Sequence, residues 1–489
     1  MSPRGRSALS RRRSRQRRGR SALAYRREAQ KPPWVRLLGR YRLATWLVIL
    51  VVAVAVVLIG VAAFFVERAA VAGRNGEQAL LQAVSAVEHG PSTGITSSQI
   101  EAATSRVAAA TGDFDAMRRD LNRGGPALTV ARYIPFIRVQ VRAADTLADT
   151  GQELAASAKA LVDTAGQFVR PANPNQPLSD PVKELQPLHS AAATALSALD
   201  SAAAQVASLN DDRLVGPLNS ARAALDQHLP HLLARATDAE QALRAFIVFA
   251  GGAGPRRYLL LSQNPDEVRP TGGFIGTYGV MSANNGHLSL DRYDAIENWY
   301  RPRPKAVVPE NQAPPIFQIV GSDQNLANIN AEPDWPTDAQ VAEELWQQGG
   351  EAPVDGVLSM TPAFLARVVG VLGPVSVPAY GETVTGANLI QRVNFWTHSE
   401  AVLPQPGGRK EFVAALSQVV FQRLLAAPAS QWEPLAAAGA AGFDAGEAML
   451  SADDPDVAGP AANHGWDGGF PPKGSNGDFY FDSEFETTA

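Results

Sequence analysis

The chain of 489 residues contains no cysteine. Disulfide frameworks, thiolate metal sites and cysteine nucleophiles are therefore excluded. The sequence also lacks a P-loop, an HExxH zinc motif, a GxSxG nucleophile elbow and a GxGxxG turn after a strand, and its seven histidines are scattered. A metal site built on histidines is therefore not expected either.

Acidic residues are almost absent from the first part of the chain, and the net charge of only −4 hides this. Residues 1–42 hold 15 of the 44 basic and one of the 48 acidic residues, a balance of +14. The rest holds 29 basic and 47 acidic residues, a balance of −18. The basic end predicts a disordered cytoplasmic tail that sets membrane topology, with anionic lipid as the alternative partner. No nucleic-acid partner is expected, because no folded basic module accompanies the run.

A run of 24 uncharged residues, residues 43–66, separates these two parts. As a helix it would be about 36 Å long, enough to cross a hydrocarbon core of about 30 Å. Positive residues stay on the cytoplasmic side, so we expect a single-pass cell-membrane protein with residues 67–489 outside. A signal peptide cleaved near Ala72 is the alternative, although the apolar run is longer than is typical of one.

The part predicted to lie outside the membrane changes composition twice. Residues 67–250 are rich in alanine and leucine and contain no tryptophan, which favours an all-α bundle or stalk. Residues 251–441 alternate strand and helix signals, which predicts a layered α-β-α domain of the α/β class. Residues 442–489 are acidic and rich in glycine and proline, so we expect mostly loop there. Helical spacing predicts helices over residues 69–89, 97–123, 139–168, 187–208 and 213–249.

Local signals place the elements of the α/β part. Asn285 and Gly286 can form the tight turn of a hairpin, and Thr337 with Gln340 forms a capping pair before a helix. The elements expected, in order, are strands over 257–262, 274–283 and 288–293, a helix over 338–348, a strand over 354–360, a helix from Thr361, a strand over 375–377, a helix after Thr385 and a last strong helix over 409–425.

The densest polar cluster is residues 263–276, QNPDEVRPTGGFIG, directly after the first predicted strand. Ligands of open α/β sheets bind outside the carboxyl ends of strands. Asn264, Asp266 and Glu267 offer oxygen ligands to a hard cation. The alternative is an Asn-Pro-Asp turn with a structural role.

The same cluster also carries groups that suit an anion. Arg269 can pair with phosphate or carboxylate, and a turn at Thr271, Gly272 and Gly273 frees backbone N–H groups that can form an anion-binding concavity.

Two further arginines are candidates outside this cluster. Arg292 belongs to a second basic cluster, for which a solvated surface of mixed charge is the alternative. Arg409 opens the last predicted helix, where a helix N-terminus favours an anion.

Four strings carry a resemblance to an uncharacterised bacterial family, domain of unknown function 4012. They are RYLLLSQNPDEVRPTGGFIGTYGVM, VDGVLSMTPAFLARVVGVLGPVSVP, TVTGANLIQRVN and RKEFVAALSQVVFQRLL, and the likeness extends over residues 127–466. Members of this family are typically single-pass membrane proteins, often from actinobacteria, and no activity is established for them. The resemblance therefore implies a membrane protein and leaves its activity open.

The order of the elements is also similar to that of the LytR-CpsA-Psr phosphotransferases. These enzymes attach glycopolymers from a polyprenyl-pyrophosphate carrier to peptidoglycan outside the membrane. By this resemblance, Asp266 or Glu267 would hold Mg²⁺. Arg269 and Arg409 would be the catalytic residues that hold the pyrophosphate.

Two functions fit these features. The first is a membrane-anchored protein of the cell envelope that binds or transfers a polyprenyl-phosphate-linked glycopolymer in cell-wall assembly. The second is a non-enzymatic envelope scaffold or polymer-binding protein. The expected partners are the lipid bilayer, a lipid-linked glycan and peptidoglycan.

Overall fold

The computed structural model of the protein describes residues 97–123, 135–169, 174–177, 180–209, 214, 216–301, 325–399 and 410–470. The predicted tail, the predicted membrane segment, the helix predicted over 69–89 and Arg409 lie outside these residues. Within the described ranges, no helix combines the length and the apolar composition needed to span a membrane.

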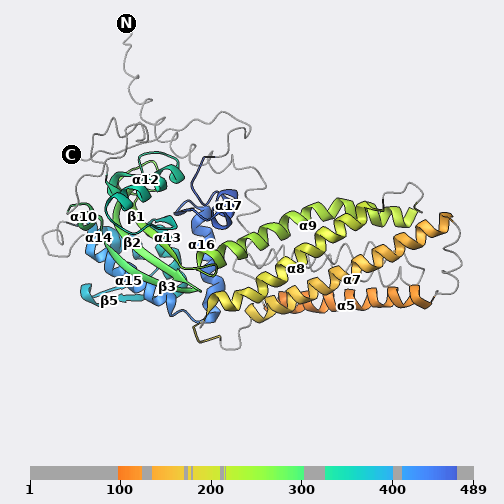
Figure 1. Ribbon diagram of the computed structural model, residues 1–489. Helices are drawn as coiled ribbons and strands as arrows, with labels where there is room; N and C mark the ends of the chain where they lie inside the picture. Colours follow the sequence, from red (N-terminus) through yellow and green to blue (C-terminus); the bar gives the residue numbers. More distant parts are fainter. Residues whose placement is uncertain are drawn as a thin grey trace, which may run out of the picture. The chain divides into compact units, whose positions relative to one another are not determined.

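Four long helices form the first described part, and they lie side by side in Figure 1. Each packs mainly against its neighbours in the sequence. Their core is built mainly from alanine and leucine in similar numbers, with fully buried leucines such as Leu154, Leu161 and Leu199. Helix axes can approach closely where the contacting side chains are small. The four helices are α5 (Ser97–Arg123), α7 (Pro135–Val169), α8 (Pro181–Ala207) and α9 (Gly216–Phe249).

A five-stranded sheet of order β3-β2-β1-β4-β7 forms the centre of the second part. Strands β1 and β4 are parallel, and the other neighbouring pairs are antiparallel. The apolar run of β1 follows from its position, because a strand buried on both faces needs apolar side chains on both. The strands are β1 (Arg256–Asn264), β2 (Phe274–Asn284), β3 (His287–Ala295), β4 (Gly356–Met360) and β7 (Ala448–Ala452).

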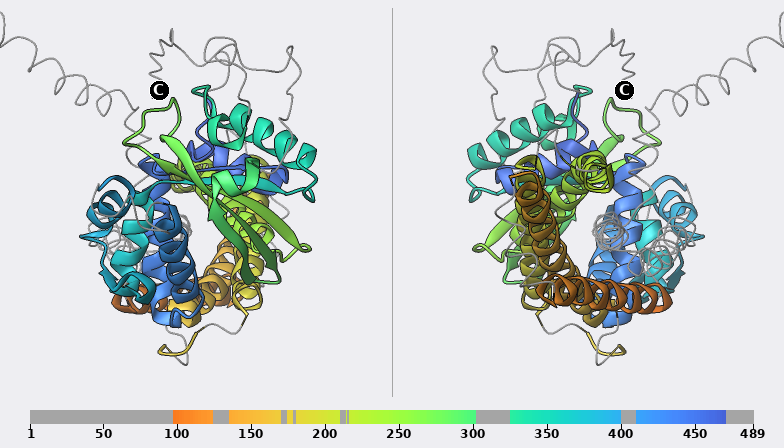
Figure 2. Two further views of the ribbon diagram at one scale, coloured as in Figure 1. Left: turned by 90° about the vertical axis from the view of Figure 1, so that its left-hand side faces the viewer. Right: turned by 90° about the vertical axis from the view of Figure 1, so that its right-hand side faces the viewer.

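Helices pack on both faces of this sheet, as the turned views in Figure 2 show. Leu259 and Leu261 share a core with α12 (Trp335–Gln348), whereas Leu260 faces the other side. There it joins a core with side chains of α13 (Pro362–Leu372) and α16 (Trp432–Asp444). The alternation follows from the two-residue period of a strand.

Smaller elements complete this part of the chain. Strands β5 (Val375–Val377) and β6 (Glu382–Val384) pair with each other and not with the main sheet. The remaining helices are α10 (Ile296–Tyr300), α14 (Leu389–His398), α15 (Lys410–Leu425) and α17 (Pro455–His464), with short 3₁₀ turns η1 (Leu326–Asn328), η2 (Pro378–Tyr380) and η3 (Ala429–Gln431).

Two local expectations were wrong. The N-cap of α12 is Asp334, whose carboxylate accepts a hydrogen bond from the Thr337 N–H, so Thr337 with Gln340 is not the capping pair. The loop expected beyond residue 442 is replaced at two places, by β7 and by α17. Strand β7 has weak strand signals of its own and is held by its pairing with β4. Helix α17 begins at the N-cap Asp454.

The helical part is joined to the sheet part by hydrogen bonds as well as by the chain. The N–H of Ala429 donates to the carbonyl of Gln176 at 2.8 Å, and Arg244 of α9 pairs with Asp456 of α17 at 2.7 Å. Gly286, in the β2–β3 hairpin turn, lies so close to the backbone of Val182 that a larger side chain would crowd it. The chain near residue 251, where the composition changes, is therefore not a flexible linker between two separate parts.

Candidate functional site

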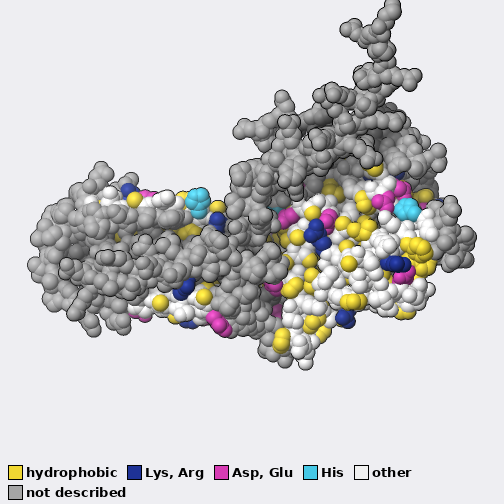
Figure 3. All heavy atoms as spheres, turned by 180° about the vertical axis from the view of Figure 1, so that it is seen from behind, with side chains coloured by type: hydrophobic (Ala, Val, Ile, Leu, Met, Phe, Trp, Pro, Cys, Tyr) yellow, Lys and Arg dark blue, Asp and Glu magenta, His cyan; other side chains and the backbone are white. Residues whose placement is uncertain are grey.

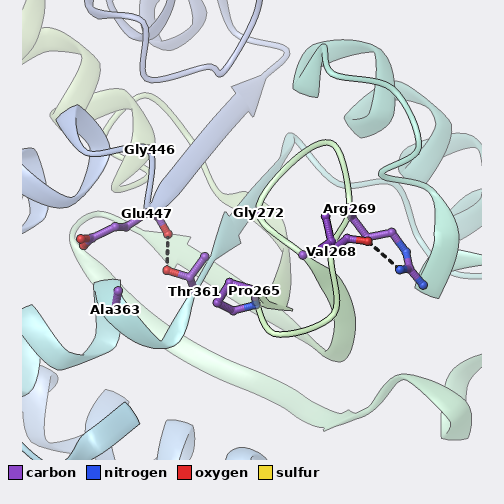
Figure 4. Close-up of a pocket in the computed structure, with 9 residues that line it drawn as sticks. Pro265, Val268, Arg269, Gly272, Thr361, Ala363, Gly446 and Glu447 are labelled. Carbon is purple, nitrogen blue, oxygen red and sulfur yellow. Dashed lines mark hydrogen bonds between the residues drawn. The ribbon is translucent and has the colours of Figure 1, made fainter. Parts of the chain in front are cut away.

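The carboxyl ends of the two parallel strands lie next to each other, since Ser262 of β1 is in register with Met360 of β4. This is the edge at which open α/β sheets bind ligands. The loop after β1 and the start of α13 after β4 enclose a pocket of about 370 Å³ there (Figure 4). The pocket is lined by Pro265, Val268, Arg269, Gly272, Gly273, Thr361, Ala363, Gly446 and Glu447.

Two glycines form one wall of this pocket. Gly272 and Gly273 have φ angles of 68° and 110°, which L side chains rarely adopt. A Cβ atom on Gly272 would overlap the side-chain oxygen of Gln263, and one on Gly273 would overlap the carbonyl oxygen of Asn264. The turn expected here therefore exists, and both positions require glycine.

A buried polar network supports the turn from behind. The Asn330 amide donates to the carbonyls of Thr271 at 2.8 Å and Gly273 at 2.6 Å. The Gln263 amide also donates to the Thr271 carbonyl, at 2.8 Å. The Thr271 hydroxyl donates to Asp338 at 3.2 Å. Sequence reasoning missed Asn330 and Asp338, because both lie about 60 residues beyond the turn and belong to no recognisable motif.

Asp338 is a fully buried carboxyl group. Burial raises its pKa well above the usual range, while hydrogen bonds from the Glu332 N–H and the Thr271 hydroxyl lower it. The group lies behind the turn and is not one of the pocket-lining residues.

The N-terminus of α13 forms the facing wall. Thr361 is the N-cap and Pro362 the first helical residue, as the sequence predicted. The Thr361 N–H and hydroxyl both donate to the carbonyl of Glu447, at 2.9 and 3.1 Å. The N–H groups of a first helical turn have no partner within the helix and carry a partial positive charge. Ala363, in that turn, lines the pocket.

Two charged pocket residues differ in their surroundings. Glu447 accepts two hydrogen bonds from Arg367 of α13, so its negative charge is balanced. The Arg269 guanidinium donates to the Val268 carbonyl at 2.8 Å and lies over the Phe274 ring, 5.3 Å from its centroid. In Figure 4 its side chain extends away from Glu447. Arg269 is thus at the rim of the pocket, on the side of the glycine turn.

Asn264 organises the preceding turn. Its side-chain oxygen accepts from the Asp266 N–H at 3.2 Å, and its amide donates to the Glu267 carboxylate at 3.4 Å. In the part of the chain that the structure describes, no three His, Asp or Glu side chains are grouped so that they could hold a metal ion. Asp266 and Glu267 therefore form no built metal site with other described side chains, and their role as Mg²⁺ ligands stays a prediction.

The structure does not bring Arg292 into the pocket. Arg292 pairs with Glu351 at 3.0 Å and lies over the rings of Tyr278 and Trp346. These contacts link β3 to α12 and to the chain after it. Arg409 lies outside the described residues, so the expected pairing of Arg269 with Arg409 stays a prediction.

Comparison with known proteins finds a family model that matches part of the chain. No curated protein and no solved structure matches the chain. The remote likeness to LytR-CpsA-Psr phosphotransferases therefore remains a prediction. Residues 253–395, which include both walls of the pocket except Gly446 and Glu447, match the family model described as Protein of unknown function (DUF4012), as the sequence led us to expect.

Proposed function

We propose that the protein is a membrane-anchored, extracytoplasmic protein of the cell envelope that binds the phosphate group of a polyprenyl-phosphate-linked glycopolymer. The binding site is the pocket at the carboxyl ends of β1 and β4. The observation that carries the proposal is that the turn at Gly272 and Gly273 and the N-terminus of α13 face one another across this pocket.

Both walls suit an anion. A helix N-terminus presents N–H groups and a partial positive charge of roughly half an elementary charge. A glycine turn lets backbone N–H groups approach a ligand closely. Arg269 adds a full positive charge at the rim, and Arg367 neutralises Glu447, the acidic residue of the lining.

The surface favours a few placed groups over a general affinity for polyanions. On the face shown in Figure 3, acidic and basic side chains of the described residues are scattered among apolar ones and form no single charged patch. The predicted membrane segment would keep the protein on a membrane, where lipid-linked phosphates are found. The predicted membrane segment and the pocket therefore both favour a lipid-linked phosphate as the ligand.

Binding without transfer is the form of this function that the described residues favour. Arg292, one of the expected anion-binding residues, is engaged by Glu351 and two aromatic rings. A transferase would need further groups from outside the described residues, Arg409 among them.

The test uses the full chain in lipid nanodiscs and native mass spectrometry. We expect it to bind a polyprenyl phosphate at least tenfold more tightly than the matching polyprenol, which is about 1.4 kcal/mol. Arg269→Ala should weaken phosphate binding about tenfold. Arg423→Ala, the same change at an exposed residue of α15 outside the pocket, is the control and should have little effect. Equal binding of the phosphate and the alcohol would overturn the proposal.

A further inference from the structure

The peptide group between Thr271 and Gly272 is held from one side by buried amides. Its carbonyl oxygen accepts from the side chains of Gln263 and Asn330, both at 2.8 Å, and from the Gly273 N–H within the turn at 2.9 Å. Asn330 is 0% exposed and Gln263 is 2% exposed, so water cannot replace these donors. Besides the Gly273 bond within the turn, the direction of the carbonyl is therefore fixed by two side chains that do not line the pocket.

A trans peptide points its C=O and its N–H in opposite directions. Because the Thr271 carbonyl points at Asn330 and Gln263, the Gly272 N–H points to the opposite side. The peptide between Gly273 and Phe274 provides a check on this geometry. The Gly273 carbonyl also faces Asn330, and the following N–H, that of Phe274, points the other way and reaches the Glu267 carbonyl at 3.0 Å. For the Gly272 N–H, no acceptor is found among the described residues.

Two atoms of this buried network reduce the stability of the fold, so stability alone does not explain the network. The side-chain oxygens of Gln263 and Asn330 are buried and have no hydrogen-bond partner among the described residues. A buried polar atom left in this state lowers the stability of the fold, because its desolvation is not offset by a hydrogen bond. The Gln263 oxygen also faces pocket-lining Gly272 at the position that a Cβ would fill. Local costs of this kind are typical of functional sites, where the geometry matters more than the last increment of stability.

We propose that Asn330 is a positioning residue for phosphate recognition, which orients the Thr271–Gly272 peptide so that the Gly272 N–H is aimed at a ligand oxygen in the pocket. This inference rests on the proposed function. Gln263 assists Asn330 at the same carbonyl, and Asp338 holds the Thr271 side chain. The phosphate lies between the Gly272 N–H on one wall and the first turn of α13 on the other.

The readout that tests this role is the ratio of polyprenyl phosphate affinity to polyprenol affinity. Asn330→Asp keeps the size of the side chain but replaces both donors with carboxylate oxygens. Its ratio should fall at least tenfold while polyprenol affinity stays within twofold. Gln263→Met removes one donor to the Thr271 carbonyl and leaves Asn330 in place, so its ratio should fall about threefold. Gln263→Met therefore provides the test if Asn330→Asp does not fold.

A purely structural role would give a different result, and a matched variant identifies it. Thr277→Val removes a buried hydroxyl that donates to the Tyr293 hydroxyl and not to a group of the turn. It should lower the unfolding temperature without changing the affinity ratio. If the wild type has a high ratio and both turn variants keep it, the positioning role is wrong while the proposed function stands. If the wild type itself does not prefer the phosphate, the proposed function fails and the positioning role fails with it.

Discussion

Arg367 and Glu447 form a two-point ion pair beside the pocket. The Arg367 Nε donates to one carboxylate oxygen at 2.5 Å, and the Nη2 donates to the other at 2.7 Å. The pair joins α13 to the turn before β7, and it places one neutralised carboxylate next to a predicted anion site. Changing either partner alters the charge that a phosphate would meet there.

The two partners should therefore have opposite effects on binding. Arg367→Ala leaves the Glu447 charge unbalanced and should weaken polyprenyl phosphate binding about threefold, since interactions of partly exposed charges are small. Glu447→Gln removes the negative charge and should strengthen binding by a similar factor. Titration in nanodiscs at low ionic strength measures both. Changes in the same direction would contradict this account of the pocket.

The glycine turn should tolerate no side chain at its second position. Gly273→Ala forces a positive φ on alanine and a clash with the Asn264 carbonyl, so the free energy of unfolding should fall by about 2 kcal/mol. Six of the eight tryptophans lie beyond residue 250, so tryptophan fluorescence during denaturation reports this part of the chain.

Gly276→Ala is the matched control for that variant. A Cβ atom on Gly276 meets nothing within 4 Å, and its φ is not positive. Its unfolding free energy should stay within about 0.5 kcal/mol of the wild type. Similar losses for the two variants would show that the turn does not constrain Gly273.

Glu343 of α12 should make stability depend on pH. Burial, together with the nearby charges of Asp453 and Asp355, raises its pKa from the ordinary 4.5 to about 7. Between pH 4.5 and 7 the folded chain therefore holds a proton that the unfolded chain has released, and stability falls as the pH rises. Glu343→Gln should remove this loss.

The measurement is the unfolding temperature of wild type and Glu343→Gln at a series of pH values. The difference between them is a constant offset well below pH 4.5, where Glu343 is protonated in both the folded and the unfolded state. It should then shift in favour of the variant until about pH 7 and level off above it. A difference that does not change with pH would contradict the raised pKa.

The absence of cysteine makes the predicted topology easy to test. Ser376→Cys, on the exposed side of β5, and Ser7→Cys, in the basic tail, each introduce a single thiol. In intact cells a membrane-impermeant maleimide should label Ser376→Cys alone, and lysis should expose Ser7→Cys. Labelling of Ser7→Cys in intact cells would contradict the orientation. Loss of residue 7 from the mature protein would favour the cleaved signal peptide.

Local signals in the sequence were sufficient for many elements. The helix predicted over residues 97–123 is α5, and the hairpin turn has positive φ angles at Asn285 and Gly286. Helix α13 begins at Thr361 and Pro362. Each of these depends on a preference of a few neighbouring residues, such as the fixed φ of proline, and so can be predicted without a partner segment.

Elements that depend on a distant partner were not found in this way. Strand β7 is a strand because β4 lies beside it, about 90 residues earlier in the chain. Residues 375–377 are extended as predicted, but they pair with β6 and not with the main sheet. Arg292 was expected at a binding site, yet Glu351 and two aromatic rings surround it. Pairing of this kind depends on tertiary context more than on intrinsic strand preference.

By itself, the sequence determined the division of charge at residue 43, the uncharged run and the loop in which two glycines meet an arginine. These are properties of composition and of neighbouring residues. Only the tertiary structure decided that the N-terminus of α13 faces this loop and that Asn330 holds it from behind. Both relationships join residues about 60 to 90 positions apart. The first arises because β1 and β4 lie side by side in the sheet, and the second because the segment around η1 packs against β2.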